Sequence, residues 1–171
     1  MDLILADPPA PQNMPALSIA AITVALTQVN NFQAMFRPGQ PLAAIGALVD
    51  QLFGTDQQEA QRLQALIPQV KNDLANNYCA LTGQPLWDPF TPEKAAWLQI
   101  AINQQAQVAN SRYQQTGDRV QLRYVRAFQE LTRENENRLL QAKRQVQGPD
   151  LQTIGLGISA IALLGKITNS F

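Results

Sequence analysis

Histidine is absent from this sequence, and cysteine occurs once, at Cys79. These two absences exclude the usual zinc and haem ligand sets, histidine-activated nucleophiles and an internal disulfide. Charged residues are also scarce, at 15 % of the 171 residues, and 13 basic side chains balance 13 acidic ones. The chain is long enough for one domain, and it lacks the bulk positive charge that binds nucleic acid phosphates.

Enzyme motifs are missing as well. The sequence has no glycine-rich phosphate loop and no Cys-x-x-Cys pair. Glu130 and Glu134 can share one helix face, but neither histidine nor a second matched carboxylate pair accompanies them, as a di-metal site requires. We therefore expect a protein that is not an enzyme, with no catalytic residue, no cofactor and no bound metal ion.

Amides supply the polarity that charges do not. The chain contains 23 Gln and 11 Asn, spread among Ala and Leu instead of clustered. This composition predicts a folded helical protein with wide neutral surfaces. Such surfaces suit burial against other subunits, because a partnered amide costs less to bury than a charge.

No segment alternates polar and apolar residues with a period of two, so we predict an all-α fold, an elongated helical hairpin or bundle. Helices are expected over 16–36, 42–53 and 55–81, the last one opened by a capping box formed by Thr55 and Gln58. The predicted organisation is an extended proline-rich arm over 1–13, a helical region over 14–90 with a proline- and aromatic-rich linker at 83–90, a long helix or helix pair over 91–147, and an apolar C-terminal helix over 149–171.

The long helix is predicted over about 92–146, after Thr91 as its cap and before Gly148-Pro149, which we expect to end it. A continuous helix of about 55 residues would be roughly 80 Å long, too long for a compact bundle of this size. Thr116-Gly117-Asp118 is the alternative break, with Asp118 as a second cap.

The N-terminus has no basic region, and Asp7 interrupts its short apolar run, so we predict that it is not a secretory signal and that the protein is made in the cytoplasm. Cys79 is predicted to be buried, because Leu74, Tyr78 and Leu81 occupy positions of a helical core face.

Arginines recur every seven residues at Arg112, Arg119, Arg126 and Arg133. On one helix they would form a column, which could meet an acidic partner or phosphates. We favour a solvated face instead, in which Arg126 pairs with Glu130 and Glu134 pairs with Arg138.

A second heptad pattern crosses the same helix and includes the candidate interface residues Val125 and Phe128. Periodicity alone allows the helix to be covered by other chains or by its own domain. Trp87 and Phe90 are candidate contact residues of the linker, which we expect to dock through them. The alternating a and d positions of this pattern form a seam along the helix, made of Val125, Phe128, Thr132, Asn135, Leu139, Ala142 and Val146.

The C-terminal segment is apolar and uncharged from Leu151 to Gly165, but it is shorter than the roughly 20 residues that span a bilayer. Packing in a core or subunit interface is our main expectation, and membrane contact is the alternative. The candidate residues are Ile154, Ile158, Ile161 and Leu164.

The arm from Asp7 to Pro11, the Ala/Gln-rich helix over 95–111, the Arg/Glu/Gln-rich helix over 118–146 and the terminal apolar segments together resemble small virion proteins of tailed bacteriophages. They are most similar in style to the internal, ejected proteins of short-tailed phages. The resemblance implies a helical, membrane-active protein packed at the portal or tail, and assigns no role to any single residue.

We therefore expect a structural component of a multi-subunit assembly, made in the bacterial cytoplasm and carried in a virion. The alternatives are an adaptor or tail-hub subunit fixed in the particle and a bacterial coiled-coil scaffold. The expected partners are copies of this chain and other subunits of the assembly, with membrane contact left open and no sequence-specific contact with nucleic acid.

Overall fold

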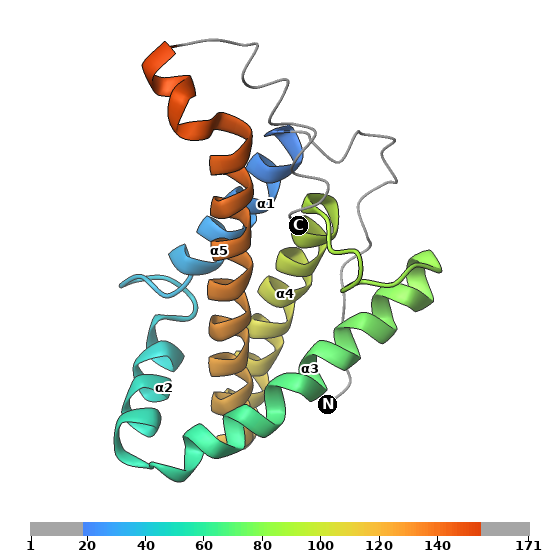
Figure 1. The fold of residues 1–171 in the computed structure, drawn as a ribbon. Coiled ribbons are helices and arrows are strands. Elements are labelled where there is room, and N and C mark those ends of the chain that lie inside the picture. The colour runs from blue at the N-terminus through green and yellow to red at the C-terminus, as the bar shows by residue number, and fades with distance from the viewer. Residues whose placement is uncertain (1–18, 155–171) are drawn as a thin grey trace.

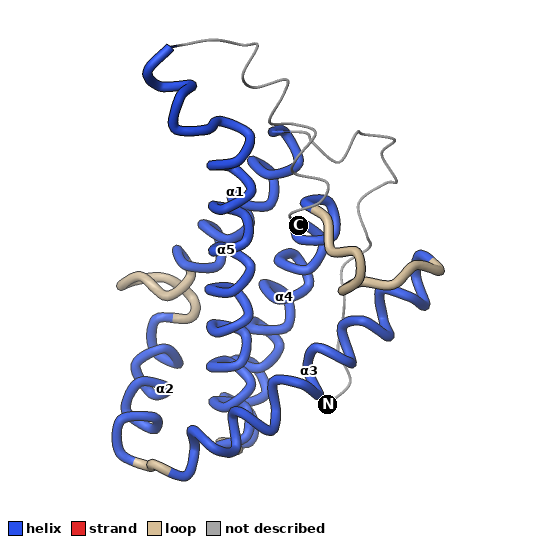
Figure 2. The backbone as a smooth tube through the Cα atoms, in the orientation of Figure 1, coloured by secondary structure: helices blue, strands red, loops and turns tan. Residues whose placement is uncertain are grey.

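The computed structural model describes the backbone of residues 19–154 and the side chains of residues 19–146. This part of the chain folds into five helices without a strand, which confirms the predicted all-α class (Figures 1 and 2). The helices are α1 (Ile19–Ala34), α2 (Ala43–Thr55), α3 (Gln58–Thr82), α4 (Pro92–Thr116) and α5 (Arg119–Ile154).

Helix α5 organises the bundle, because it contacts each of the other four helices. It lies beside α4, while α3 crosses it obliquely and α2 packs near its N-terminal half (Figure 1). The predicted seam on α5 is buried along its whole length, from Val125 to Val146, against helices of the same chain. Of the two arrangements that the periodicity allows, the structure has the helix covered by its own domain.

The N-terminal half of helix α4 is buried on nearly all sides. Every residue from Lys94 to Gln99 is buried, and so are Ala101, Ile102 and Asn103. An amphipathic surface helix buries only one stripe, so this pattern places α4 in the interior of the bundle. Trp97 is its largest fully buried side chain, and Tyr78 of α3 meets the indole edge-to-face at 4.9 Å between ring centroids.

The ends of α4 follow from local sequence. Thr91 accepts a hydrogen bond from the Lys94 backbone N–H at 3.3 Å, and Pro92 is the first helical residue. Gly117 ends α4 in the left-handed region, with a φ of 66°, and Asp118 then accepts a bond from the Val120 N–H at 2.9 Å. The segment over 92–146 is therefore a pair of helices divided at Gly117.

Two predictions about helix ends are wrong. Thr55 does not cap α3. It is the last residue of α2, where its hydroxyl donates to the Gln51 carbonyl, and Asp56 instead accepts the Gln58 N–H at 3.0 Å. Gly148-Pro149 does not end α5, which continues to Ile154 and changes direction in its last turns (Figure 1). A proline inside a helix removes one backbone bond and can bend the helix without ending it.

The prediction of a buried Cys79 is also wrong, because its thiol is exposed. The buried stripe of α3 runs through Leu66, Val70, Leu74 and Tyr78, at spacings of four residues. Cys79 follows Tyr78 directly, so it lies about 100° around the helix from the stripe.

The predicted arm over 1–13 and the candidate residues Ile158, Ile161 and Leu164 lie outside the described residues. Ile154 is the last residue of α5, and its side chain is not among those described. Among the helices of residues 19–154, none combines the length and the apolarity needed to cross a membrane.

Candidate interaction surfaces

The four heptad arginines do not form one column. Gly117 separates Arg112, on α4, from Arg119, Arg126 and Arg133, on α5. The three arginines of α5 each have an acidic partner within the chain, so they do not form a free basic stripe. The pairs are Arg119 with Asp56 at 3.5 Å, Arg126 with Asp50 at 3.6 Å and Arg133 with Glu130 at 3.0 Å.

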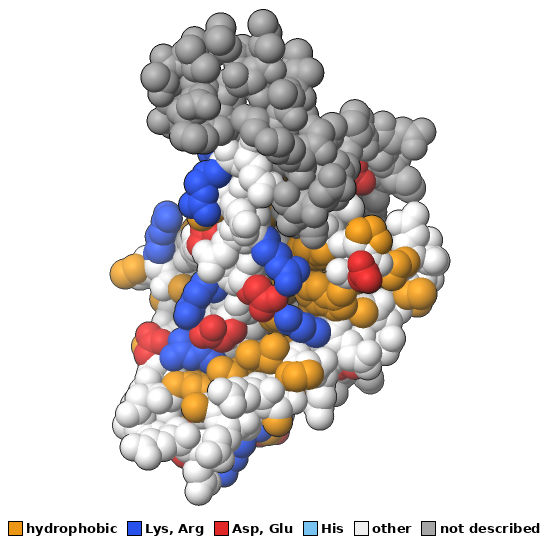
Figure 3. Space-filling view, viewed as in Figure 1, with side chains coloured by type: hydrophobic (Ala, Val, Ile, Leu, Met, Phe, Trp, Pro, Cys, Tyr) orange, Lys and Arg blue, Asp and Glu red, His pale blue; other side chains and the backbone are white. Residues whose placement is uncertain are grey.

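Of the two predicted ion pairs on α5, one is present. Glu134 and Arg138 lie 3.3 Å apart, whereas Arg126 turns away from Glu130 toward α2. Its guanidinium lies over the Phe53 ring, 4.9 Å from the centroid, which holds it there as a cation–π contact. The outer side of α5 is consequently a surface of mixed sign, on which basic and acidic groups alternate (Figure 3).

The strongest electrostatic cluster was not among the predicted sites. Glu59, at the start of α3, has a fully buried carboxylate that accepts two hydrogen bonds from Arg123 of α5, at 2.8 and 3.1 Å, and one from Arg62 at 2.8 Å. Hydrogen bonding to Arg123 is the main reason that the pKa of Glu59 lies below its usual value of 4.5. A single carboxylate thus ties α3 to α5, and no heptad or sequence motif marks it.

The linker docks through its aromatic residues, as predicted. Phe90 is buried and stacks on Trp87 with ring centroids 5.3 Å apart, and the Trp87 indole N–H donates to the Lys71 carbonyl at 3.0 Å. Lys94 secures the loop from the other side, donating to the carbonyls of Pro85 and of Pro89. Burial lowers the pKa of Lys94. The two aromatic candidates therefore hold the chain together internally.

The interior polar residues of α4 and α5 form an amide network. The Gln99 amide donates to Asn103 at 3.1 Å and to the Thr132 hydroxyl at 2.8 Å, and its oxygen accepts from Asn135 at 3.2 Å. Asn103 in turn donates to the Gln28 carbonyl of α1 at 3.0 Å. Thr132 and Asn135, the polar members of the predicted seam, thereby fix the contact between helices without any charge.

A groove of about 340 Å³ opens between the C-terminal end of α1 and the middle of α5, and we call it the α1–α5 groove. Phe36 forms part of its wall and is seated against Gly46 of α2, where an added Cβ would come 2.8 Å from the ring. Gln33 bonds the Glu136 carboxylate across it at 3.2 Å. The lining residues are Phe32, Gln33, Phe36, Gln129, Thr132, Arg133 and Glu136.

Uncharged side chains cover the outer sides of two helices. No residue of α1 is charged, and its exposed residues include Ile19 and Val24, at 46 % and 50 % exposure. The exposed residues of α3 from Gln64 to Ala80 are also uncharged, and we call them the α3 amide face (Figure 3). They are Gln64, Ala65, Pro68, Gln69, Asn72, Asn76, Cys79 and Ala80.

In the described part of the chain, no group of three or more cysteine or carboxylate side chains is placed to hold a metal ion. The chain matches no protein family, no curated protein and no solved structure.

Proposed function

We propose that this chain is a non-enzymatic structural subunit of a multi-component assembly that contacts copies of itself and other subunits through uncharged helix surfaces. The single observation that carries the proposal is the α3 amide face. This surface follows one helix for 17 residues, from Gln64 to Ala80, and the two charged side chains in that stretch, Lys71 and Asp73, are only partly exposed.

The contrast with α5 supports an interface on this side. Solubility is normally secured by charged side chains spread over the surface, as they are on the outer side of α5 (Figure 3). Interface cores are depleted of charge, because a buried charge must lose its water. The small Ala65 and Ala80 beside amides would allow close approach of another helix, with hydrogen bonds still available to it.

Within this class, the virion of a tailed bacteriophage is the assembly that the composition suggests. The support is the style of the sequence: a proline-rich arm, amide-rich helices and apolar terminal segments, as in small internal virion proteins. A tail or portal position, ejection with the genome and membrane contact belong to the same proposal.

The test measures the mass of the full chain in solution at micromolar concentration, by light scattering after size exclusion. We expect a discrete oligomer, and we expect the double variant Asn72→Lys, Asn76→Lys to reduce its mass. These two substitutions place a pair of like charges one helical turn apart on the α3 amide face. A parent chain that stays monomeric at this concentration would overturn the proposal.

A matched control adds the same charge elsewhere. Gln114 and Gln115 are exposed near the end of α4 and do not belong to the α3 amide face, so Gln114→Lys with Gln115→Lys should leave the mass unchanged. If both double variants lower the mass equally, net charge is the cause and the α3 amide face loses its special role.

A further inference from the structure

The loop between α1 and α2 stands out from the bundle as a fixed turn (Figure 2). All five residues of this turn knob, residues 37–41, are exposed. Pro38 followed by Gly39, which has a φ of 81°, matches a type II turn, and the Gln40 N–H closes it on the Arg37 carbonyl at 3.0 Å. Because the turn is fixed in advance, docking it costs little conformational entropy.

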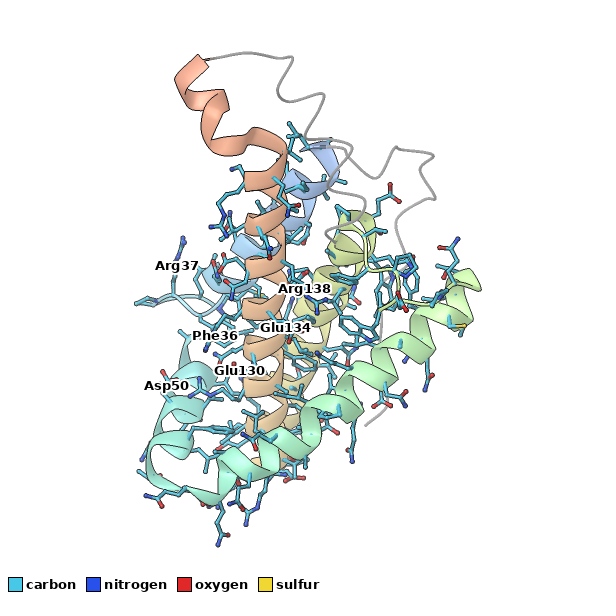
Figure 4. All side chains as sticks on the ribbon, in the orientation of Figure 1. Phe36, Arg37, Asp50, Glu130, Glu134 and Arg138 are labelled. Carbon is cyan, nitrogen blue, oxygen red and sulfur yellow. The ribbon has the colours of Figure 1, made fainter. Side chains whose placement is uncertain are left out.

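The turn knob begins next to the α1–α5 groove, since Phe36 of the groove wall immediately precedes Arg37. The Arg37 side chain stands out from the bundle (Figure 4). Glu136, on α5, lines the groove. Neither has an ion-pair partner among the described side chains, although Glu136 accepts the amide of Gln33. An unpaired cation on a projecting turn thus adjoins an unpaired anion in a groove.

We propose that a second copy of this chain docks here, with the turn knob of each copy seated in the α1–α5 groove of the other. The Arg37 guanidinium then pairs with the partner's Glu136, and Pro38 lies against the partner's Phe36 ring. A two-fold axis forms both contacts at once, because knob and groove share one surface. The inference rests on the proposed function, since it specifies one contact of the assembly.

The surroundings of the groove favour a second copy as the occupant. Gln33 belongs to the groove and to the uncharged outer side of α1, which continues through Asn30 and Asn31. An amide both donates and accepts, so such a surface complements itself, whereas a charged surface repels its own copy. Leu140, 38 % exposed and one turn beyond Glu136, adds an apolar contact beside the ion pair.

The test uses two charge reversals in the full chain, Arg37→Glu and Glu136→Arg. Each one places like charges together at both contacts of the two-fold pair. We expect each variant alone to raise the dissociation constant about tenfold or more, measured by sedimentation velocity. Far-ultraviolet circular dichroism should match the parent, because both side chains lie at the surface.

Mixing the two variants decides the identity of the partner. In a mixed pair, Glu at position 37 of one copy meets Arg at position 136 of the other, and Arg37 of the second copy meets Glu136 of the first. Both contacts are therefore restored, and association should return to within about threefold of the parent. An ion pair within one chain, or a contact with a different protein, would give no such rescue.

Two results separate this inference from the proposed function. An oligomeric parent whose two reversed variants keep its mass, or whose variants fail to associate on mixing, overturns the knob-and-groove contact and leaves the assembly proposal standing. A monomeric parent overturns the proposed function first, and this contact with it. Arg119→Glu is the control, since Arg119 is 61 % exposed at the start of α5 and lies outside the groove lining, so its reversal should leave the dissociation constant unchanged.

Discussion

The molecule stabilises two groups of buried polar side chains in different ways. At the junction of α3 and α5, the charge on Glu59 is balanced by Arg62 and Arg123. Between α4 and α5, the network centred on Gln99 contains only amides and a hydroxyl. The two sites differ in their access to water, since the Arg62 side chain remains 43 % exposed, whereas Gln99 is fully enclosed.

This difference shows where the fold tolerates charge. A carboxylate loses its hydration on burial, and only several well-placed hydrogen bonds compensate for that loss. The arginines around Glu59 provide these bonds and keep part of their own hydration at the edge of the bundle. In the interior of the bundle no such edge exists, and amides satisfy one another at a lower desolvation cost.

Removing the carboxylate should have the largest effect. Glu59→Ala leaves Arg123 partly buried without its partner, and we expect the free energy of unfolding to fall by about 3–5 kcal/mol. Chemical denaturation measures this loss. Glu130→Ala is the matched control, because it removes an acid from a mostly exposed pair with Arg133 and should cost no more than about 1 kcal/mol. Equal losses in the two variants would contradict the distinction between buried and exposed charge.

The amide network should respond less strongly. Gln99→Leu keeps the approximate volume of the side chain but leaves the Asn135 amide short of an acceptor and Asn103 short of a donor, which should cost about 2–3 kcal/mol. Thermal and chemical denaturation would show the loss, with the exposed Gln104→Leu as the control. A Gln99→Leu variant as stable as the parent would mean that the network adds nothing to stability.

The two sites also differ in how far the sequence predicts them. Thr132 and Asn135 fall on the heptad seam, so periodicity alone predicts that they lie on a covered face of the helix. No sequence pattern predicts the burial of Glu59 or its pairing with Arg123. Its environment depends on how α3 crosses α5, and that crossing brings together residues 64 positions apart. The caps at Thr91 and Asp118 were predictable, since a cap depends on a few adjacent residues.

The four heptad arginines do not form one column, for a related reason. A spacing of seven places side chains together only while one helix continues, and Gly117 interrupts it between Arg112 and Arg119. The pairing of Arg126 with Asp50 depends on the position of α2, which no spacing within α5 encodes. Local patterns therefore predicted the helices and most of their buried faces, but not the long-range pairing of charges or the α1–α5 groove.

The pH dependence of stability gives the finest test of the charged site. Because the pKa of Glu59 is lower in the folded protein, its carboxylate stabilises the fold above the unfolded pKa, which is near 4.5. This contribution is lost as the pH falls through the folded pKa.

Glu59→Gln removes the titration but keeps the size of the side chain, so the difference in unfolding free energy between parent and variant should shrink below about pH 4.5. Contributions of the other carboxylates are common to both proteins and cancel in that difference. Denaturation curves from pH 7 to pH 3 measure it, and a difference that stays constant over this range would show that the ionised form of Glu59 adds no stability beyond that of its neutral form.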